Sequence, residues 1–198
     1  PNVLSVELAE DVGFHFGATV DSVQYFPEVQ NKVFGLKIYM NHTTGTLLQE
    51  DPKVLQTIFE SWPKPKLIVL TIQKEVAQRI VAKPPDMSIL AISVQYFANA
   101  KIVDYISKGS FRPIPKVDSA IIKLKPKSQI LNPKQIKELF DIVRLGFSSK
   151  RKKLLNNLAG KFDKQLLEKI FLETGLDLNT RAEELSLENW VDLVGKLS

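Results

Sequence analysis

The sequence contains no cysteine and only two histidines, His15 and His42, among its 198 residues. Without cysteine the chain can form neither a disulfide framework nor a cysteine-ligated zinc site, and two isolated histidines argue against a histidine metal site. No apolar run reaches the ~18 to 20 residues that a membrane-spanning helix requires. These absences predict a soluble, globular protein of the cytoplasm that has no metal site and no membrane span.

Acidic residues are scarce in one span of the chain. Residues 101–161 hold fifteen Lys and Arg against four Asp and Glu, a net charge of +11, whereas the whole chain carries +5. Clustered positive charge is typical of a protein that binds a polyanion, because each cation that meets a phosphate releases a condensed counterion. Charge alone favours nucleic acid only modestly over a solvated lysine-rich surface. The nature of the partner therefore depends on the motifs.

The order of apolar runs and helix signals predicts an α/β domain. Helices are expected after Asp51 and over residues 73–82, and residues 88–99 fit either a helix or a strand. The last two expected strands are consecutive and form an antiparallel hairpin at one edge of the sheet, and the strand before them is expected to be buried in a parallel sheet. The expected strands are 3–8, 32–40, 66–72, 100–106 and 117–124.

From Pro126 onward the pattern becomes helical. Asn132 and Gln135 predict a capping box, with Pro133 at the first helical position. The expected helices are 136–145, 151–159, 164–174 and 187–197. We therefore divide the chain into an α/β domain, residues 1–127, and a small all-helical domain, residues 128–198, which needs the support of the first.

An aromatic residue precedes the last expected strand on a stiff arm, in the stretch FRPIPKVDSAIIKL. Pro113 and Pro115 hold the residues before them extended, so that Phe111 is presented rigidly. Ligands of open α/β sheets bind beyond the carboxyl ends of the strands, where an aromatic ring can hold a flat, extruded base. On physical grounds alone, a structural role for Phe111 as a cap on the core is the better explanation.

These motifs resemble those of the ribosomal RNA adenine dimethyltransferases, a family that includes the erythromycin-resistance methylases. FRPIPKVDSAIIKL is similar to the family's FxPxPKVDSAVVxL, and LIVLTIQKEVAQRIVAKP to its strand and QKEVAxRxxAxP helix. SVQYFANAKIV, GFSSKRKKLLNNL and RAEELSLENWVDL match further family segments in the same order. The matches cover residues 66–198, about two thirds of the chain, and their number and order make the resemblance specific.

The resemblance implies a Rossmann-like domain that binds S-adenosylmethionine and a helical domain that grips RNA. It further implies methylation of adenine N6 in small-subunit rRNA by a monomer that docks on the immature small ribosomal subunit. Phe111 carries over as the residue that stacks on the extruded adenine, and Asp118 is expected to organise the turn rather than to perform chemistry. The expected RNA contacts are Arg112, Lys116, Lys150, Arg151, Lys152 and Lys153.

The first third of the chain departs from the family's pattern. The family's donor loop, GxGxG, is absent from the sequence, in which Gly13 and Gly17 are four apart. Glu7 is the expected contact to the ribose of S-adenosylmethionine. Tyr39 and Asn41 are the candidates for the residues that act on the adenine amino group, although no proline lies between them. The methyltransferase domain is therefore expected to be incomplete, with its first strand and donor loop truncated, divergent or incompletely represented.

Three functions are compatible with these residues. The first is S-adenosylmethionine-dependent dimethylation of adenine N6 in rRNA. The second is RNA binding or ribosome assembly without methylation, and the third is transcriptional regulation on the same scaffold. Binding of the methyl donor separates the first function from the others, and binding of rRNA against duplex DNA separates the second from the third.

Overall fold

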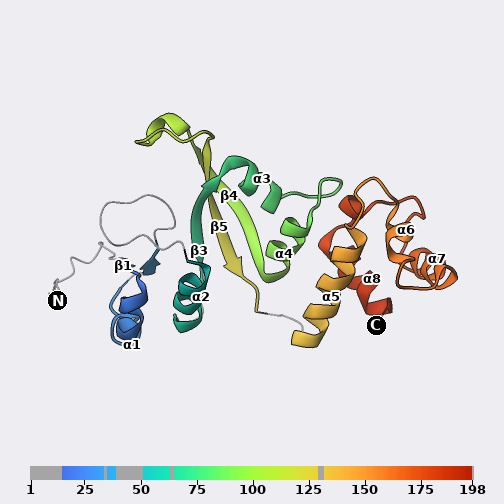
Figure 1. Ribbon diagram of the computed structural model, residues 1–198, viewed down its shortest axis with the longest axis horizontal. Coiled ribbons are helices and arrows are strands. Elements are labelled where there is room, and N and C mark those ends of the chain that lie inside the picture. The colour runs from blue at the N-terminus through green and yellow to red at the C-terminus, as the bar shows by residue number, and fades with distance from the viewer. Residues whose placement is uncertain (1–14, 34, 39–50, 63–64, 129–131, 198) are drawn as a thin grey trace. The chain divides into compact units, whose positions relative to one another are not determined.

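The structure is a computed structural model that describes residues 15–33, 35–38, 51–62, 65–128 and 132–197. The chain divides into two compact units, Pro1–Pro65 and Lys66–Ser198, each considered by itself (Figure 1). The predicted boundary between residues 127 and 128 lies inside the second unit, and that division stays a prediction. The expected strand at 3–8 lies outside the described residues.

The described residues of the first unit form two short strands and three helical segments. Its elements are β1 (His15–Gly17), η1 (Val20–Tyr25), α1 (Phe26–Val29), β2 (Gly35–Lys37) and α2 (Pro52–Ser61). β1 and β2 are parallel. The predicted start of α2 is confirmed, because the Asp51 carboxylate accepts the Lys53 N–H at 2.8 Å and Pro52 occupies the first turn.

Aromatic rings dominate the core of the first unit. Phe26 is 1% exposed, and its ring packs edge-on against Phe16 and Trp62, with centroids 6.1 and 5.0 Å away. Ala18 and Ile58 are the other buried members of this cluster. Edge-to-face contacts of this kind stabilise a core beyond the apolar area that they bury. Phe26 of α1 therefore connects β1 to the end of α2.

The second unit contains a three-stranded antiparallel sheet. Its strands are β3 (Ile68–Gln73), β4 (Ala98–Ile106) and β5 (Ser119–Pro126), in the order β3-β5-β4. The predicted hairpin of β4 and β5 is confirmed, and β4 lies at the edge. The register places Leu70 and Ile102 opposite Ile122 on either side of it. Residues that pair across a ladder share a face, so all three strands contribute apolar side chains to one face of the sheet.

The prediction of a parallel, fully buried strand at residues 66–72 is wrong for the described structure. β3 pairs with antiparallel β5, and its residues alternate between half-buried and exposed, with Val69 57% exposed. α3 (Lys74–Ile80) follows β3 directly and packs against the sheet, in which Ala120 and Ile122 are fully buried. A continuous apolar run does not show which of its faces a neighbouring element will cover.

The segment that fitted either a helix or a strand is a helix, α4 (Ile89–Phe97). Ser88 begins it, because its hydroxyl accepts a backbone N–H of the first turn at 3.2 Å. The Gln95 side chain donates to the carbonyls of Ile80 and Ala82, both at 2.8 Å. These bonds tie α4 to the end of α3.

Four helices and a short 3₁₀ turn make up the described residues of the tail, which we define as residues 128–198. They are α5 (Pro133–Gly146), α6 (Leu154–Leu158), α7 (Lys164–Glu173), η3 (Ala182–Glu184) and α8 (Leu187–Leu197). The predicted capping box of Asn132 and Gln135 at the start of α5 is confirmed. Gly175 ends α7 at φ 68°, and the Leu176 N–H donates to the Phe171 carbonyl at 2.8 Å, as in a Schellman motif.

One hydrophobic core joins α4 to the tail helices. Ile92 and Tyr96 of α4 belong to the same buried cluster as Leu158, Phe171 and Trp190. The packing is close, because a Cβ added to Gly146 would lie 2.4 Å from the Trp190 ring. α4 therefore supplies part of the core on which the tail depends.

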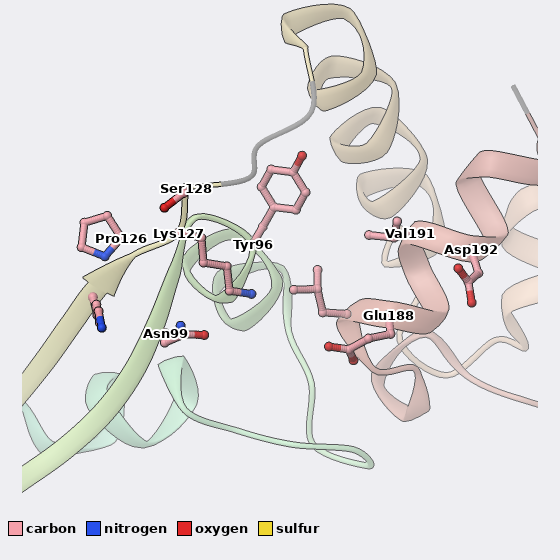
Figure 2. Close-up of a pocket in the computed structure, with 10 residues that line it drawn as sticks. Tyr96, Asn99, Pro126, Lys127, Ser128, Glu188, Val191 and Asp192 are labelled. Carbon is pink, nitrogen blue, oxygen red and sulfur yellow. The ribbon is translucent and has the colours of Figure 1, made fainter. Parts of the chain in front are cut away.

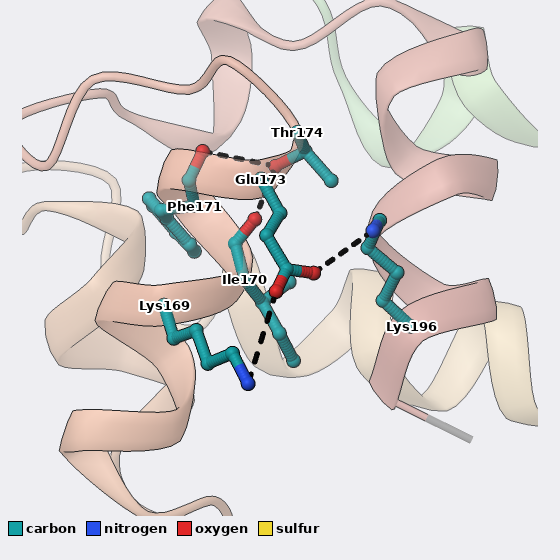
Figure 3. A network of polar contacts seen from close by, with 6 residues as sticks. All are labelled: Lys169, Ile170, Phe171, Glu173, Thr174 and Lys196. Carbon is teal, nitrogen blue, oxygen red and sulfur yellow. Dashed lines mark hydrogen bonds and ion pairs between the residues drawn. The ribbon is translucent and has the colours of Figure 1, made fainter.

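An exposed ion-pair network links the last two long helices (Figure 3). The Glu173 carboxylate accepts a hydrogen bond from Lys196 Nζ at 3.0 Å and lies 3.9 Å from Lys169 Nζ. The hydrogen bond and the charge of Lys196 lower the pKa of Glu173. Exposed ion pairs contribute little to stability, so this network adds only slightly to the stability of the contact between α7 and α8.

Candidate nucleic-acid interface

Phe111 lies on the arm that connects β4 to β5, which we define as residues 107–118. The arm contains the 3₁₀ turn η2 (Lys108–Ser110) and extends beyond the sheet (Figure 1). Phe111 follows η2 with an extended backbone, φ −111° and ψ 153°, and its side chain is half-buried. Ile114, on the same arm, is 59% exposed. The arm therefore presents an aromatic residue at the end of the sheet where β3 and β4 finish.

Asp118 fixes the base of the arm. Its Oδ1 accepts the Lys108 N–H at 3.0 Å, and its backbone carbonyl accepts the Lys74 N–H, also at 3.0 Å. One residue thus connects the start of η2, the start of β5 and the start of α3. The prediction that Asp118 organises the turn is confirmed by these bonds.

The two cations of the arm differ in how they are held. The Arg112 guanidinium donates to the carbonyls of Gly109, at 3.2 Å, and Phe111, at 3.0 Å. The side chain of Arg112 is therefore folded back along the arm, next to the backbone of Phe111. Lys116 is exposed. Both predicted RNA contacts accordingly lie on the same short segment as Phe111.

The second set of predicted contacts lies on the basic loop, which we define as residues 147–153, between α5 and α6. Lys150, Arg151 and Lys152 are exposed, and none of the ion pairs found in the described part of the chain includes them. Lys153 differs, because its Nζ donates to the Asn179 side-chain oxygen. α6 begins only at Leu154, so the four cations precede the helix rather than forming its first turn.

The structure does not bring these two sets together. Among the described residues, no hydrogen bond or ion pair joins the arm to the basic loop, and α3 and α4 lie between them in Figure 1. An extended polymer can reach both sets, whereas a small ligand cannot. The arrangement therefore suits a nucleic acid better than a nucleotide.

Sequence reasoning missed a buried asparagine behind the basic loop. Asn157 of α6 is 7% exposed, and its Nδ2 donates to the carbonyls of Gly146 and, at 3.1 Å, Ser149. The signal was present in LLNNL, where Asn157 falls on the buried face that Leu154 and Leu158 occupy. A polar residue in an apolar stripe needs hydrogen-bond partners, and here the backbone of the loop supplies them.

Three lysines of the hairpin were counted in the charge but not singled out. Lys101 of β4 lies directly opposite Lys123 of β5, Lys125 lies two residues further along β5, and all three are exposed. Like charges directly opposite each other are unfavourable in a sheet. The sequence signal for their exposure was the alternation of Lys123 and Lys125 with apolar residues in β5. They extend the positive charge of the second unit onto the exposed face of the sheet.

A hollow of about 720 Å³ lies between the end of β5 and α8 (Figure 2). Its lining includes Tyr96, Asn99, Lys125, Lys127, Glu188 and Asp192. The pKa of Glu188 is lowered, mainly by hydrogen bonds from its own backbone N–H and the Ser186 hydroxyl, with a smaller contribution from Lys127. The hollow adjoins the last residues of β5, whereas the arm leads into the first residue of that strand. It therefore lies at the opposite end of the sheet from Phe111.

Comparison with known proteins identifies the relatives of this chain. The family model described as "Ribosomal RNA adenine dimethylase" matches residues 47–198. The chain belongs to the ribosomal RNA adenine dimethylase family. The resemblance predicted from the motifs is thereby confirmed, and the match extends it by nineteen residues towards the amino terminus, from residue 66 to residue 47.

Several curated relatives in this family are named "Ribosomal RNA small subunit methyltransferase A". The protein of Trichormus variabilis is 37% identical over 177 residues, which cover 87% of this chain and 64% of the relative. The protein of Crocosphaera subtropica is 44% identical, covering 66% and 49%, and that of a Nostoc species 34% identical, covering 98% and 68%. The chain thus spans about half to two thirds of the length of these relatives.

Two solved structures share the fold of this family member. The 23S rRNA methyltransferase ErmE aligns with a TM-score of 0.59 and 16% identity, covering 92% of this chain and 80% of that one. A dimethyladenosine transferase from Plasmodium falciparum aligns with a TM-score of 0.56 and 24% identity, covering 83% and 73%. The predicted fold class, a Rossmann-like methyltransferase domain with an antiparallel hairpin and a helical tail, is confirmed by this likeness.

The described residues do not include a donor loop of the kind that the family implies. GxGxG is absent from the sequence, and none of the described turns that follow a strand has that spacing. Glu7, Tyr39 and Asn41, the predicted donor and adenine contacts, lie outside the described residues and stay predictions. Among the residues that the structure describes, no group of His, Asp or Glu could hold a metal ion, and no helix is long and apolar enough to cross a membrane.

Proposed function

We propose that this chain takes part in S-adenosylmethionine-dependent dimethylation of adenine N6 in small-subunit rRNA, and that its second unit holds the RNA. The observation that carries the proposal is Phe111 on an arm whose base is fixed by Asp118 and which also bears Arg112 and Lys116. Membership of the family and the names of relatives at 34 to 44% identity support it.

The role of Phe111 in this proposal is to stack on the target adenine. Adenine N6 is out of reach inside a duplex, so the base has to be extruded, and a flat ring then stabilises it. Stacking of a base on an aromatic side chain contributes ~1 to 3 kcal/mol. The bonds from Asp118 and Arg112 hold the backbone at Lys108 and at Phe111, so that in this proposal the ring is positioned before the base arrives.

The basic residues are proposed to contact the RNA backbone. Lys150, Arg151 and Lys152 carry three adjacent charges into solvent, and contact with phosphates relieves their mutual repulsion while releasing counterions. Lys116 and Arg112 are proposed to contact phosphates next to the extruded base. The partner is small-subunit rRNA in the immature small ribosomal subunit, bound by a monomer in the cytoplasm.

S-adenosylmethionine supplies the methyl groups in this proposal. Glu7 is proposed to contact its ribose, and Tyr39 and Asn41 to approach the adenine amino group, on the family resemblance alone. The proposal is tested first by calorimetric titration of the folded chain with S-adenosylmethionine and S-adenosylhomocysteine. Micromolar binding would place a donor site within these 198 residues.

The stacking role has its own test. Phe111→Leu should lower the rate of methyl transfer to unmethylated small-subunit rRNA about tenfold, since ~1.4 kcal/mol of stacking is lost. Ile114→Ala, at an exposed position on the same arm, is the matched control and should leave the rate within about twofold. An unchanged rate for Phe111→Leu in an active sample would show that the ring does not hold the base.

A second candidate function is RNA binding without methylation. The absence of GxGxG from the sequence is the specific observation that favours it. A folded sample that binds small-subunit rRNA but neither donor compound would establish this function for the chain. Stronger binding of duplex DNA than of rRNA would instead favour a transcription factor on the same scaffold.

A further inference from the structure

The inner side of the basic loop is held by a single buried side chain. Asn157 donates both to the carbonyl of Gly146, where α5 ends, and to the carbonyl of Ser149, inside the loop. The Ser149 carbonyl also accepts the Lys152 N–H at 3.1 Å, which forms the turn that carries the cations. Asn157 thus fixes the end of α5 and the turn to each other.

The outer side of the loop is held by a neighbouring turn, residues 177–180. The Asp177 carboxylate accepts the Asn179 N–H at 2.6 Å, and the Asn179 side chain accepts a hydrogen bond from Lys153 Nζ. The Thr180 carbonyl accepts the Leu154 N–H at 2.8 Å. Two bonds from this turn therefore fasten the point at which the loop enters α6.

We propose that Asn157 and Asn179 are positioning residues that fix the basic loop in an RNA-binding conformation, and that Lys153 acts as a brace rather than as a phosphate contact. The inference rests on the proposed function, because it assumes that Lys150, Arg151 and Lys152 meet RNA phosphates. The inference divides the four cations of residues 150–153 by role. The first three contact the RNA, and Lys153 holds the loop in place.

The physical reason for two braces lies in the charge of the loop. Four adjacent cations repel one another, and an unrestrained loop separates them by moving over many conformations. RNA binding then has to order both backbone and side chains, which lowers the affinity. A loop that is held before the RNA arrives avoids this cost. Amide donors suit the inner brace, because a buried N–H group satisfies a backbone carbonyl without adding charge.

Asn157→Asp tests the inner brace. A carboxylate in this position cannot donate to the carbonyls of Gly146 and Ser149, so the loop should be released. We expect affinity for a labelled small-subunit rRNA transcript to fall about tenfold, which corresponds to ~1.4 kcal/mol. Asn156→Asp, at the exposed neighbouring position, introduces the same charge and should change the affinity less than about twofold.

Trypsin provides a readout that charge alone would not change. The loop contains four cleavage sites, after Lys150, Arg151, Lys152 and Lys153, and a braced loop should resist cleavage there. Asn157→Asp should accelerate cleavage at these sites, whereas Asn156→Asp should not. Because Asn157 is buried, its replacement can also unfold the tail. Asn179→Ala, at an exposed position, is therefore a second variant that should free the loop. Unchanged cleavage and affinity in Asn179→Ala would overturn the role of Asn179.

The role of Lys153 is tested by the salt dependence of binding. Lys152→Met should flatten the dependence of log affinity on log salt by about 0.7 to 0.9, the amount for one lost phosphate contact. Lys153→Met should lower the affinity and accelerate cleavage in the loop, while the slope stays that of the unaltered chain. Equal flattening by both variants would show that Lys153 contacts the RNA directly.

A triple variant keeps this inference separate from the proposed function. If Lys150, Arg151 and Lys152 are all changed to Ala and neither affinity nor slope changes, the loop does not bind RNA and the proposed function loses this contact. If the triple variant weakens binding but Asn157→Asp and Asn179→Ala do not, the loop binds RNA without needing its braces. The inference is supported only if RNA affinity falls both in the triple variant and in the two asparagine variants.

Discussion

The two units of the chain differ in how closely they follow the family. The family model matches residues 47–198, which include all of the second unit but only the end of the first. The residues predicted to stack on the base and to contact phosphates belong to the second unit, whereas the predicted donor contact, Glu7, and the predicted contacts to the adenine amino group, Tyr39 and Asn41, belong to the first. The predictions thus assign base stacking and phosphate contact to one part of the chain and binding of the methyl donor to another, and the two can be tested separately.

The largest expected effects come from removing one buried ring in each unit. Phe26 is 1% exposed and Phe171 fully buried, so Phe26→Ala and Phe171→Ala should each lower the unfolding free energy of their own unit by ~3 to 5 kcal/mol. The two tryptophans report on the units separately, because Trp62 packs on Phe26 and Trp190 lies in the core of the tail.

The measurement is urea unfolding followed by tryptophan fluorescence, with Trp62→Phe and Trp190→Phe versions to isolate each signal. If the units are independent, Phe26→Ala shifts only the Trp62 transition and Phe171→Ala only that of Trp190. A single transition that both variants shift alike would contradict the comparison, since the chain would then unfold as one cooperative body.

A smaller effect is expected from glycine substitutions within the tail. A Cβ at Gly146 would lie 2.4 Å from Trp190 and 2.8 Å from Leu154, so Gly146→Ala should cost ~1 to 3 kcal/mol through overpacking. Gly195 in α8 has no atom within 4 Å of such a Cβ, and Gly195→Ala should instead stabilise the helix by up to ~1 kcal/mol. Equal effects in thermal unfolding would show that the tail is less closely packed than described.

The smallest effect concerns pH and the link between α7 and α8. The pKa of Glu173 is lowered from its ordinary value of 4.5, chiefly by Lys196. A lowered folded pKa stabilises the protein above the unfolded value and ceases to do so as pH falls through the folded value. The melting temperatures of the unaltered chain and of Lys196→Met should therefore differ slightly above pH 4.5 and converge below it. A constant difference at all pH values would exclude this ion pair as the cause.

Much of the fold could be predicted because its signals are local. Asp51 with Pro52 and Asn132 with Gln135 satisfy the N–H groups of the turn that they begin, so residues a few positions apart decide where α2 and α5 start. The hairpin of β4 and β5 was likewise visible as two strands joined by a proline-containing arm. The burial of residues 66–72 was predicted wrongly, because the faces of a strand are covered by elements distant in sequence.

Of the candidate interface, the sequence showed the residue types but not their partners. It identified Phe111 and the cluster at 150–153 as parts of motifs, and these assignments stay predictions for experiment. It did not show that Lys153 bonds to Asn179, 26 residues away, while the neighbouring cations lie exposed. Side chains of one run can have different partners once the chain is folded, and a linear pattern does not distinguish them.

The sequence by itself determined the family, the starts of α2 and α5, the hairpin and the distribution of charge, because each depends on residue identities and short spacings. Tertiary structure decided which face of β3 is exposed, that residues 89–97 form a helix built into the core of the tail, and that Asn157 holds the basic loop from within. These features depend on groups that meet only after long loops have closed. Which groups meet is decided by burial and hydrogen-bond satisfaction in the whole fold.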